Sequence, residues 1–118
     1  MDGTQAEQLA ARFLKKQGYK ISECNYLVRG GEIDIIARDR NEVVFVEVRY
    51  RKSDHYGSAE ESIDGRKQQR LIKAASHYLQ EHNLWDKVPC RFDTICITVD
   101  PAQPSRQDIN WQKNAFTL

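Results

Sequence analysis

Two stretches of the chain carry apolar residues at helical spacing. In residues 5–17 the apolar positions recur every three or four residues, and Gly18 follows as a natural stop. A second amphipathic stretch begins at Ser62 or Asp64 and continues to His82. The spacing therefore predicts two helices, each with one buried face.

Four other stretches are rich in β-branched and aromatic residues and predict strands at residues 19–28, 31–37, 43–49 and 91–99. The first alternates imperfectly, and we attribute this to a bulge near Cys24 and Asn25. We expect a glycine turn at residues 30–31 and loops at residues 53–57 and 101–105. Residues 109–118 are expected to form a short final strand and a tail.

The predicted order is αβββαβ(β), which indicates an α/β sandwich around a mixed sheet. A chain of 118 residues is long enough for one real core and too short for two. We therefore expect a single domain that spans residues 1–118.

Composition narrows the class of protein. Hydrophobic residues make up 40% and charged residues 30% of the chain, as in a soluble globular domain, and no apolar run is long enough for a membrane span. The first residues show no secretion signal, and the three cysteines lack metal-ligand spacing, so we expect reduced thiols in a cytoplasmic protein. A net charge of +1 argues against a protein that coats nucleic acid through bulk charge.

Two of the predicted strands carry acids among apolar residues. Asp34 interrupts residues 31–37, and Glu47 interrupts residues 43–49. A charge in such a setting is costly unless it is paired or binds a cation. Two carboxylates that converge on one spot can hold a divalent metal, so these strands carry the candidate site.

The connection between the two strands decides which acids face each other. A two-residue turn at residues 40–41 would place Asp34 across from Glu47. The same turn would place Glu32 across from Arg49. A four-residue loop would instead place Glu32 across from Glu47. In each register the polar side chains share one face, and a polar ladder on a solvated sheet face is the alternative to a metal site.

The predicted helices add further candidates. Glu7 borders the apolar stripe of the first helix and could reach inward as another metal ligand, or it could face the helix dipole as a first-turn acid. Lys67 and Gln68 lie within the apolar arc of the second helix, which suggests that this end overhangs a polar site. A snorkelling lysine and a partly exposed glutamine are the alternative.

The basic residues are concentrated in residues 49–52 and 66–73, which contain no acid. Such local clusters are compatible with a phosphate-bearing substrate, although a solvated helix face and a strand end explain them as well on charge alone. The candidate nucleic-acid contacts are Arg49, Arg51, Lys52, Arg66, Lys67, Gln68, Arg70 and Lys73.

The acid Asp34, a short hairpin and then Glu47-Val48-Arg49 resemble the PD-(D/E)XK nuclease signature. A wider set resembles the YraN family of bacterial proteins over nearly the whole chain: Ala6-Glu7 with Ala10, Gly18-Tyr19, Asn25, residues 31–36, residues 44–49, residues 67–71, Ala75 and Arg91-Phe92-Asp93. This resemblance implies the restriction-endonuclease-like fold, a three-layer α/β/α sandwich related to archaeal Holliday-junction resolvases and tRNA endonuclease domains.

The resemblance also implies roles for individual residues. Asp34 and Glu47 match the acids that bind Mg²⁺ or Mn²⁺, with Glu7 and Glu32 in support. Asp34, Glu47, Arg49 and Lys67 match catalytic positions. Arg49 occupies the position at which most of these nucleases have lysine. An arginine can bind phosphate through two N–H groups but cannot act as a general base. Lys67 is the alternative holder of the lysine's role.

The sequence is compatible with three functions. The first is a Mg²⁺-dependent endonuclease that hydrolyses phosphodiesters in DNA, with branched or junction DNA among its candidate substrates. The second is a catalytically weak or inactive nucleic-acid-binding protein of the same fold. The third is a protein-interaction domain. A homodimer would suit a two-strand cut, but the sequence decides neither the oligomeric state nor DNA against RNA.

Overall fold

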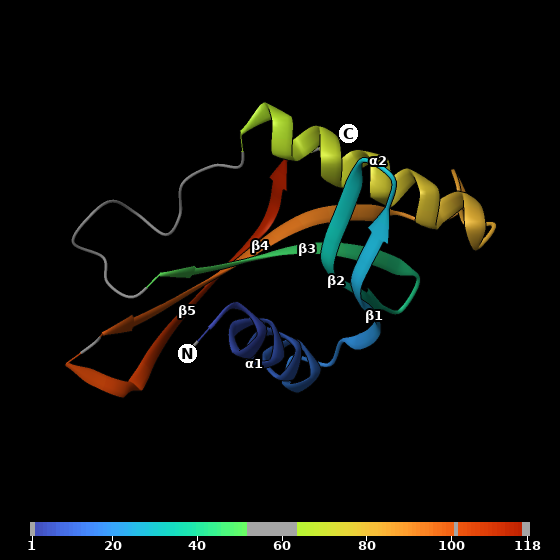
Figure 1. Cartoon of the computed structure of the whole chain (residues 1–118). Coiled ribbons are helices and arrows are strands. Elements are labelled where there is room, and N and C mark those ends of the chain that lie inside the picture. The colour runs from blue at the N-terminus through green and yellow to red at the C-terminus, as the bar shows by residue number, and fades with distance from the viewer. Residues whose placement is uncertain (1, 52–63, 101, 117–118) are drawn as a thin grey trace.

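The computed structural model describes residues 2–51, 64–100 and 102–116. Within them the chain forms two helices and five strands (Figure 1). In chain order these are α1 (Gly3–Lys16), β1 (Lys20–Val28), β2 (Gly31–Asp39), β3 (Glu42–Arg51), α2 (Gly65–Glu81), β4 (Cys90–Asp100) and β5 (Gln103–Phe116). The predicted order of elements is confirmed, whereas the loop expected at residues 53–57 lies outside the described residues.

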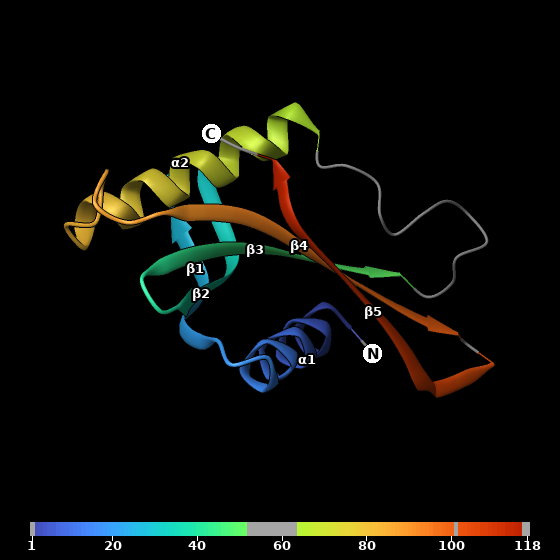
Figure 2. The same ribbon diagram turned by 180° about the vertical axis from the view of Figure 1, so that it is seen from behind.

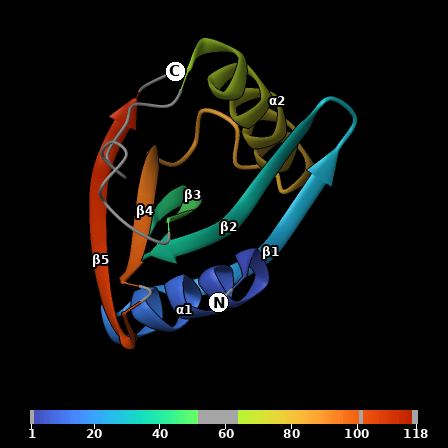
Figure 3. The same cartoon turned by 60° about the vertical axis from the view of Figure 1, so that its left-hand side comes forward.

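The strands form one sheet in the order β1-β2-β3-β4-β5, so that β1 and β5 are its edges (Figure 3). Among the described strands only β3 and β4 pair in parallel, and the chain between them contains α2. The two helices lie on opposite sides of the sheet in views from the front and from behind (Figures 1 and 2). The fold is therefore α/β with a mixed sheet. Neither α1 nor α2, the helices in the described part of the chain, is long and apolar enough to cross a membrane.

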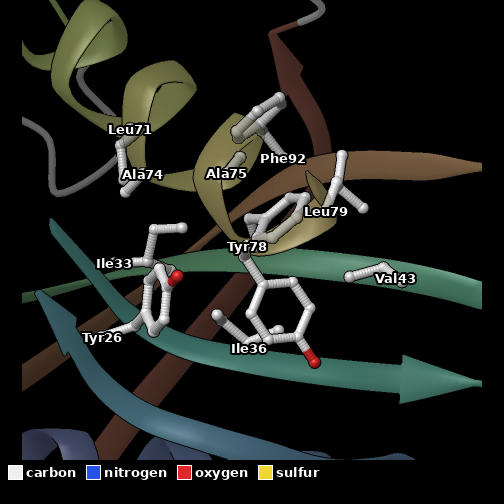
Figure 4. Close-up of a cluster of buried hydrophobic side chains, with 11 residues drawn as sticks. Tyr26, Ile33, Ile36, Val43, Leu71, Ala74, Ala75, Tyr78, Leu79 and Phe92 are labelled. Carbon is white, nitrogen blue, oxygen red and sulfur yellow. The ribbon is translucent and has the colours of Figure 1, made fainter. Parts of the chain in front are cut away.

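Each helix buries one apolar face against the sheet. Figure 4 shows the α2 side, where Leu71, Ala74 and Tyr78 pack with Ile33 and Ile36 of β2. The second cluster lies on the α1 side and joins helix residues to β2, β3 and β4; its fully buried members include Ala6, Ala10, Leu14, Ile35, Val44 and Ile95. The sheet is thus covered by apolar side chains on both faces, which explains why the acids on it are exceptional.

Side-chain caps fix the starts of both helices. The Asp2 carboxylate accepts a hydrogen bond from the Gln5 amide at 2.9 Å, and the Gln5 side chain accepts one from the Asp2 amide at 2.8 Å. This capping box starts α1 two residues before the predicted position. Gly18 follows α1 at φ +93°, as expected for a helix stop. Asp64, one of the two predicted starts, caps α2.

The prediction for the end of the chain was wrong in its extent. We expected a loop at residues 101–105 and a short strand from 109, but β5 begins at Gln103 and pairs with β4 as far as Phe116. As an edge strand, β5 takes its backbone hydrogen bonds from β4, and none of its described side chains is fully buried. Hydrophobic alternation therefore does not reveal its first half.

Two irregularities of β1 and β2 matter for the site. The β1 register shifts between Ile21 and Glu23, slightly before the predicted bulge, and Asn25 adopts φ +52°. Ile33 packs on the α2 side and Ile35 on the α1 side, although alternate residues of a regular strand share a face. The strand β2 therefore turns over at Asp34, between them.

The two-residue turn between β2 and β3 is confirmed, because Asp39 pairs with Glu42. The same register continues to Ile35 and Val46, where the β2–β3 pairing ends. Beyond this point β2 pairs only with β1, so Glu32 lies beside Leu27. The expected placement of Glu32 across from Arg49 is therefore wrong, because the two strands have already separated.

Candidate functional site

Asp34 and Glu47 lie at the fork where β2 and β3 separate. The Asp34 Oδ2 atom accepts a hydrogen bond from the Val48 amide at 2.8 Å, just beyond the last pair of the β2–β3 ladder. The Glu47 side chain is hydrogen-bonded to Asp34 and is almost fully buried, with 5% of its surface exposed. The two acids that the sequence singled out are thus in direct contact.

The pKa of Asp34 is raised to about 7. Burial of the carboxyl group is the main cause, and the nearby charge of Glu47 is the second. The hydrogen bond from Val48 and the charge of Lys67 oppose this shift. Two carboxyl groups that bond to each other need a proton or a cation between them near neutral pH. A proton held by the pair, or a cation beside it, would relieve the repulsion between the two carboxylates.

Lys67 supplies a positive charge from the start of α2. Its Nζ atom forms an ion pair with Glu47, and its amide donates to the Asp64 cap at 2.8 Å. The Lys67 side chain is 46% exposed, so it reaches the buried acid from solvent. This end of α2 overhangs the two acids, as the sequence predicted, and Gln68 lies half-buried next to Lys67 in the chain.

Glu7 approaches the same acids from α1. Partial burial raises the pKa of Glu7, and the charges of Asp34 and Glu32 add to the rise. A hydrogen bond with Asn25 acts in the opposite direction. Asn25 tolerates its left-handed backbone better than most residues, and it directs an amide toward Glu7. Sequence reasoning assigned no function to Asn25, although this residue belongs to the resemblance with the YraN family.

Glu32 turns toward α2. Its Oε1 atom lies 3.6 Å from Nη2 of Arg70, and both side chains are about half exposed. A small pocket joins this pair to the centre of the site, with Glu47, Lys67 and Leu71 as its other lining residues. Glu32 is therefore at the rim of the site rather than in contact with Asp34, and its exposed ion pair stabilises the fold little.

The donor set fits a weakly chelated hard cation. No three histidine, cysteine or acidic side chains of the described residues converge closely enough to hold a metal by themselves. Asp34 and Glu47 supply two carboxylates, and Mg²⁺ is ordinarily bound by one or two carboxylates together with water and substrate phosphates. Glu7 and Glu32 remain candidates for contacts through water.

The candidate nucleic-acid contacts separate into two groups. Arg66, Arg70 and Lys73 lie exposed along α2, beside Lys67. Arg49 and Arg51 lie in the second half of β3, in register with Cys96 and Thr98 of β4. Lys52 lies outside the described residues.

A second polar cluster is centred on the buried Asp93 and links β4 to β5. Asp93, 1% exposed, accepts hydrogen bonds from Arg91, from Trp111 Nε1 at 2.9 Å and from the Asn114 amide at 3.1 Å. Arg91 also contacts Glu42 and Tyr19. Burial alone would lower the pKa of Arg91, but Asp93 and Tyr19 raise it above its ordinary value. The described polar groups of this cluster are hydrogen-bonded to one another, as buried polar groups in a stable fold are.

The sequence of this chain matches one protein family over most of its length. The family described as "Uncharacterised protein family UPF0102" matches residues 6–97. A UPF0102 protein of Stutzerimonas stutzeri (strain A1501) is 50% identical over 114 residues, which are 97% of this chain and 92% of the relative. UPF0102 proteins of Pseudomonas syringae pv. syringae (strain B728a) and Nitrosococcus oceani (strain ATCC 19707) are 45% and 46% identical, over 97% and 98% of this chain and 91% of each relative.

Proposed function

We propose that this chain, which belongs to the UPF0102 (YraN) family, is a metal-dependent endonuclease that hydrolyses phosphodiesters in DNA. One observation carries the proposal: the buried contact between Asp34 and Glu47, with the pKa of Asp34 raised to about 7. A purely structural pair of acids would not need a position where two strands separate.

We also assign the chain to the restriction-endonuclease-like class of folds. The order αβββαβ, the parallel contact between β3 and β4, and the acids on β2 and β3 support this assignment. The helices on the two sides of the sheet supply Glu7 and Lys67 to one place, as expected for a three-layer sandwich with its site at a sheet fork.

Some residues of the site would orient the metal ligands, and others would compensate the charges of the acids and of the phosphate. Val48 fixes the Asp34 carboxylate through its amide, so this ligand is oriented before a metal arrives. A bound Mg²⁺ or Mn²⁺ would polarise the scissile phosphate and lower the pKa of a bound water. Glu7, whose pKa is raised first by burial and then by the charge of Asp34, is the candidate acceptor for a proton from that water.

Lys67 has two partners in this scheme. In the free protein its ammonium group compensates the charge of Glu47. With a cation bound beside Glu47, the half-exposed Lys67 side chain would be able to donate hydrogen bonds to a phosphate oxygen. Arg49 would supply a fixed positive charge for the phosphate, since a guanidinium does not lose its proton in this pH range.

The test is cleavage of fluorescently labelled duplex, flap and four-way-junction DNA by the purified protein with Mg²⁺ or Mn²⁺. We expect metal-dependent cleavage by the wild-type protein and none by Asp34→Asn with Glu47→Gln. Glu23→Gln with Asp108→Asn removes the same number of acids at exposed positions elsewhere and should cleave normally. Equal rates for the wild type and the site variant would overturn the proposal.

A second candidate is a nucleic-acid-binding protein without catalysis. The ion pair between Lys67 and Glu47 favours it, because the ammonium occupies the place beside the acid that a metal needs. Arg49 in the lysine position favours it as well. Salt-sensitive DNA binding that survives Asp34→Asn but is lost in Lys67→Glu with Arg70→Glu, without cleavage by any variant, would support this second function.

A further inference from the structure

A groove of about 560 Å³ lies between the end of β1 and the outer side of α2. Leu27, Val28 and Arg29 line one side of the groove, and Lys73 and His77 line the other. Leu27 is 75% exposed, which is unusual for a leucine in a strand. None of the groove's lining residues in the described part of the chain is acidic.

The groove adjoins the candidate site because the β1–β2 turn rests directly on α2. A Cβ atom on Gly31 would lie 2.5 Å from the Arg70 carbonyl oxygen, and one on Gly30 would lie 2.9 Å from Lys73 Nζ. Glu32 and Asp34 follow this turn in β2. Arg70, which lines the pocket of the site, and Lys73, which lines the groove, are about one helical turn apart.

Basic residues continue along this face of α2. Arg66, Arg70 and Lys73 recur at intervals of four and three residues, and the His77 ring follows four residues later, so all four lie on one side of the helix. The rise from Lys67 to His77 is about 15 Å, the axial length of about four base steps. Among the described residues, Arg29 and Lys73 have no carboxylate partner, in contrast to Lys67 and Arg70.

Apolar and ring surface lies beside these charges. The His77 Nδ1 atom is 2.8 Å from the Tyr26 hydroxyl and 3.9 Å from Glu81, and more than half of the imidazole side chain is exposed. With Leu27 across the groove, the imidazole forms a surface against which a flat, unpaired base can pack. Cations for phosphates next to exposed apolar or ring surface are the features of single-strand sites.

We propose that this groove binds an unpaired DNA strand next to the scissile phosphodiester. Arg29 and Lys73 bind its phosphates, and a base packs against Leu27 and His77. The inference rests on the proposed function and names its substrate class: DNA that carries a single-stranded arm at the site of cleavage. Paired bases in a duplex are stacked inside the helix and do not offer a free face to Leu27.

The test is fluorescence anisotropy without metal, so that no cleavage is needed. The probes are a fluorescein-labelled single-stranded 15-mer and a hairpin duplex. Arg29→Ala with Lys73→Ala should bind the 15-mer about tenfold more weakly. The slope of log K against log salt should fall by about 1.4 for the two lost contacts. Leu27→Ser should weaken single-strand binding and leave the salt slope unchanged.

The matched control is Arg12→Ala with Arg106→Ala, two exposed arginines on α1 and β5, and it should bind like the wild type. Circular dichroism verifies the fold of each variant. Wild-type affinity in the groove variants, or equal affinity of the wild type for both probes, would overturn the proposal. Cleavage assays distinguish the proposed endonuclease activity from the proposed groove. If the protein binds single strands through the groove but does not cleave DNA, only the endonuclease activity is disproved. If the Arg29→Ala, Lys73→Ala variant cleaves as well as the wild type, only the role of the groove is disproved.

Discussion

The Asp34 carboxylate accepts a hydrogen bond from the Val48 amide at 2.8 Å, across the point at which β2 leaves β3. A side chain thus satisfies a backbone donor where the β2–β3 ladder has ended. The bond also directs Asp34 toward Glu47, its neighbour in the fork. The geometry of the pair is therefore set by the fold itself, before any metal or substrate binds.

The raised pKa of Asp34 should make stability depend on pH. The pKa is about 7 in the fold against an ordinary value of 3.8, so between these values the folded state holds the proton more tightly than the unfolded state. Stability should therefore fall as pH rises from about 4 to about 7, by at most about 4 kcal/mol, and stay lower above pH 7. Urea denaturation in EDTA at several pH values measures the effect.

Asp34→Asn isolates this contribution, because an amide still accepts from Val48 but carries no charge. We expect the variant to be more stable than the wild type at pH 8 and the difference to shrink toward pH 4. Addition of Mg²⁺ or Mn²⁺ should stabilise only the wild type. A difference in stability between the two proteins that is the same at every pH would contradict the argument.

Lys67→Met should separate metal binding from catalysis. The variant removes the ammonium that competes with a cation for Glu47, while the stem of the side chain is kept. Because Lys67 is half exposed, the pair contributes about 1 kcal/mol, so Mn²⁺ should bind about fivefold more tightly. Cleavage at saturating Mn²⁺ should fall by about a hundredfold, because a charge that faces the phosphate is lost.

Isothermal titration with Mn²⁺ and single-turnover cleavage measure the two effects of Lys67→Met. Arg12→Met is the matched control, since it removes one positive charge from an exposed position on α1, outside the candidate site. It should change neither quantity. Unchanged or weaker Mn²⁺ binding by Lys67→Met would show that the ammonium does not compete with the metal.

Gly31→Ala should destabilise the contact between the β1–β2 turn and α2. The added methyl group would lie 2.5 Å from the Arg70 carbonyl oxygen and 3.1 Å from the Ala74 amide nitrogen, both of them helix backbone atoms. We expect a loss of about 1–3 kcal/mol, or a lower Tm by about 4–15 °C. Gly3→Ala, with nothing within 4 Å of its new methyl group, serves as the control in calorimetry. Equal melting of both variants would refute the close approach.

Asp93→Asn should be among the most destabilising single substitutions in the sheet. It takes away the charge that compensates Arg91 and leaves too few acceptors for Trp111 and Asn114. Breaking a buried ion pair from one side costs about 3–5 kcal/mol. Trp111→Phe removes only one donor and should cost about 1–3 kcal/mol in the same denaturation experiment. The network argument fails if the two variants are equally stable.

Periodicity and turn length predicted much of this fold from local information. The two-residue turn at residues 40–41 fixed the β2–β3 register, so the contact between Asp34 and Glu47 could be anticipated. The inward direction of Lys67 followed from its place in the apolar arc of its helix. By contrast, apolar and polar residues do not alternate in the first half of β5, because an edge strand with exposed side chains does not need an apolar face.

The sequence by itself determined the order of the elements, the family, and which acids could meet on neighbouring strands. Only the tertiary structure decided where β2 and β3 separate, and with it the turn of Glu32 toward Arg70 instead of Arg49. The physical reason is that a residue pattern encodes the face of a strand but not the end of its pairing. That end occurs opposite Asn25, whose left-handed backbone lies between the Cys24–Ile35 and Tyr26–Ile33 pairs of β1 and β2.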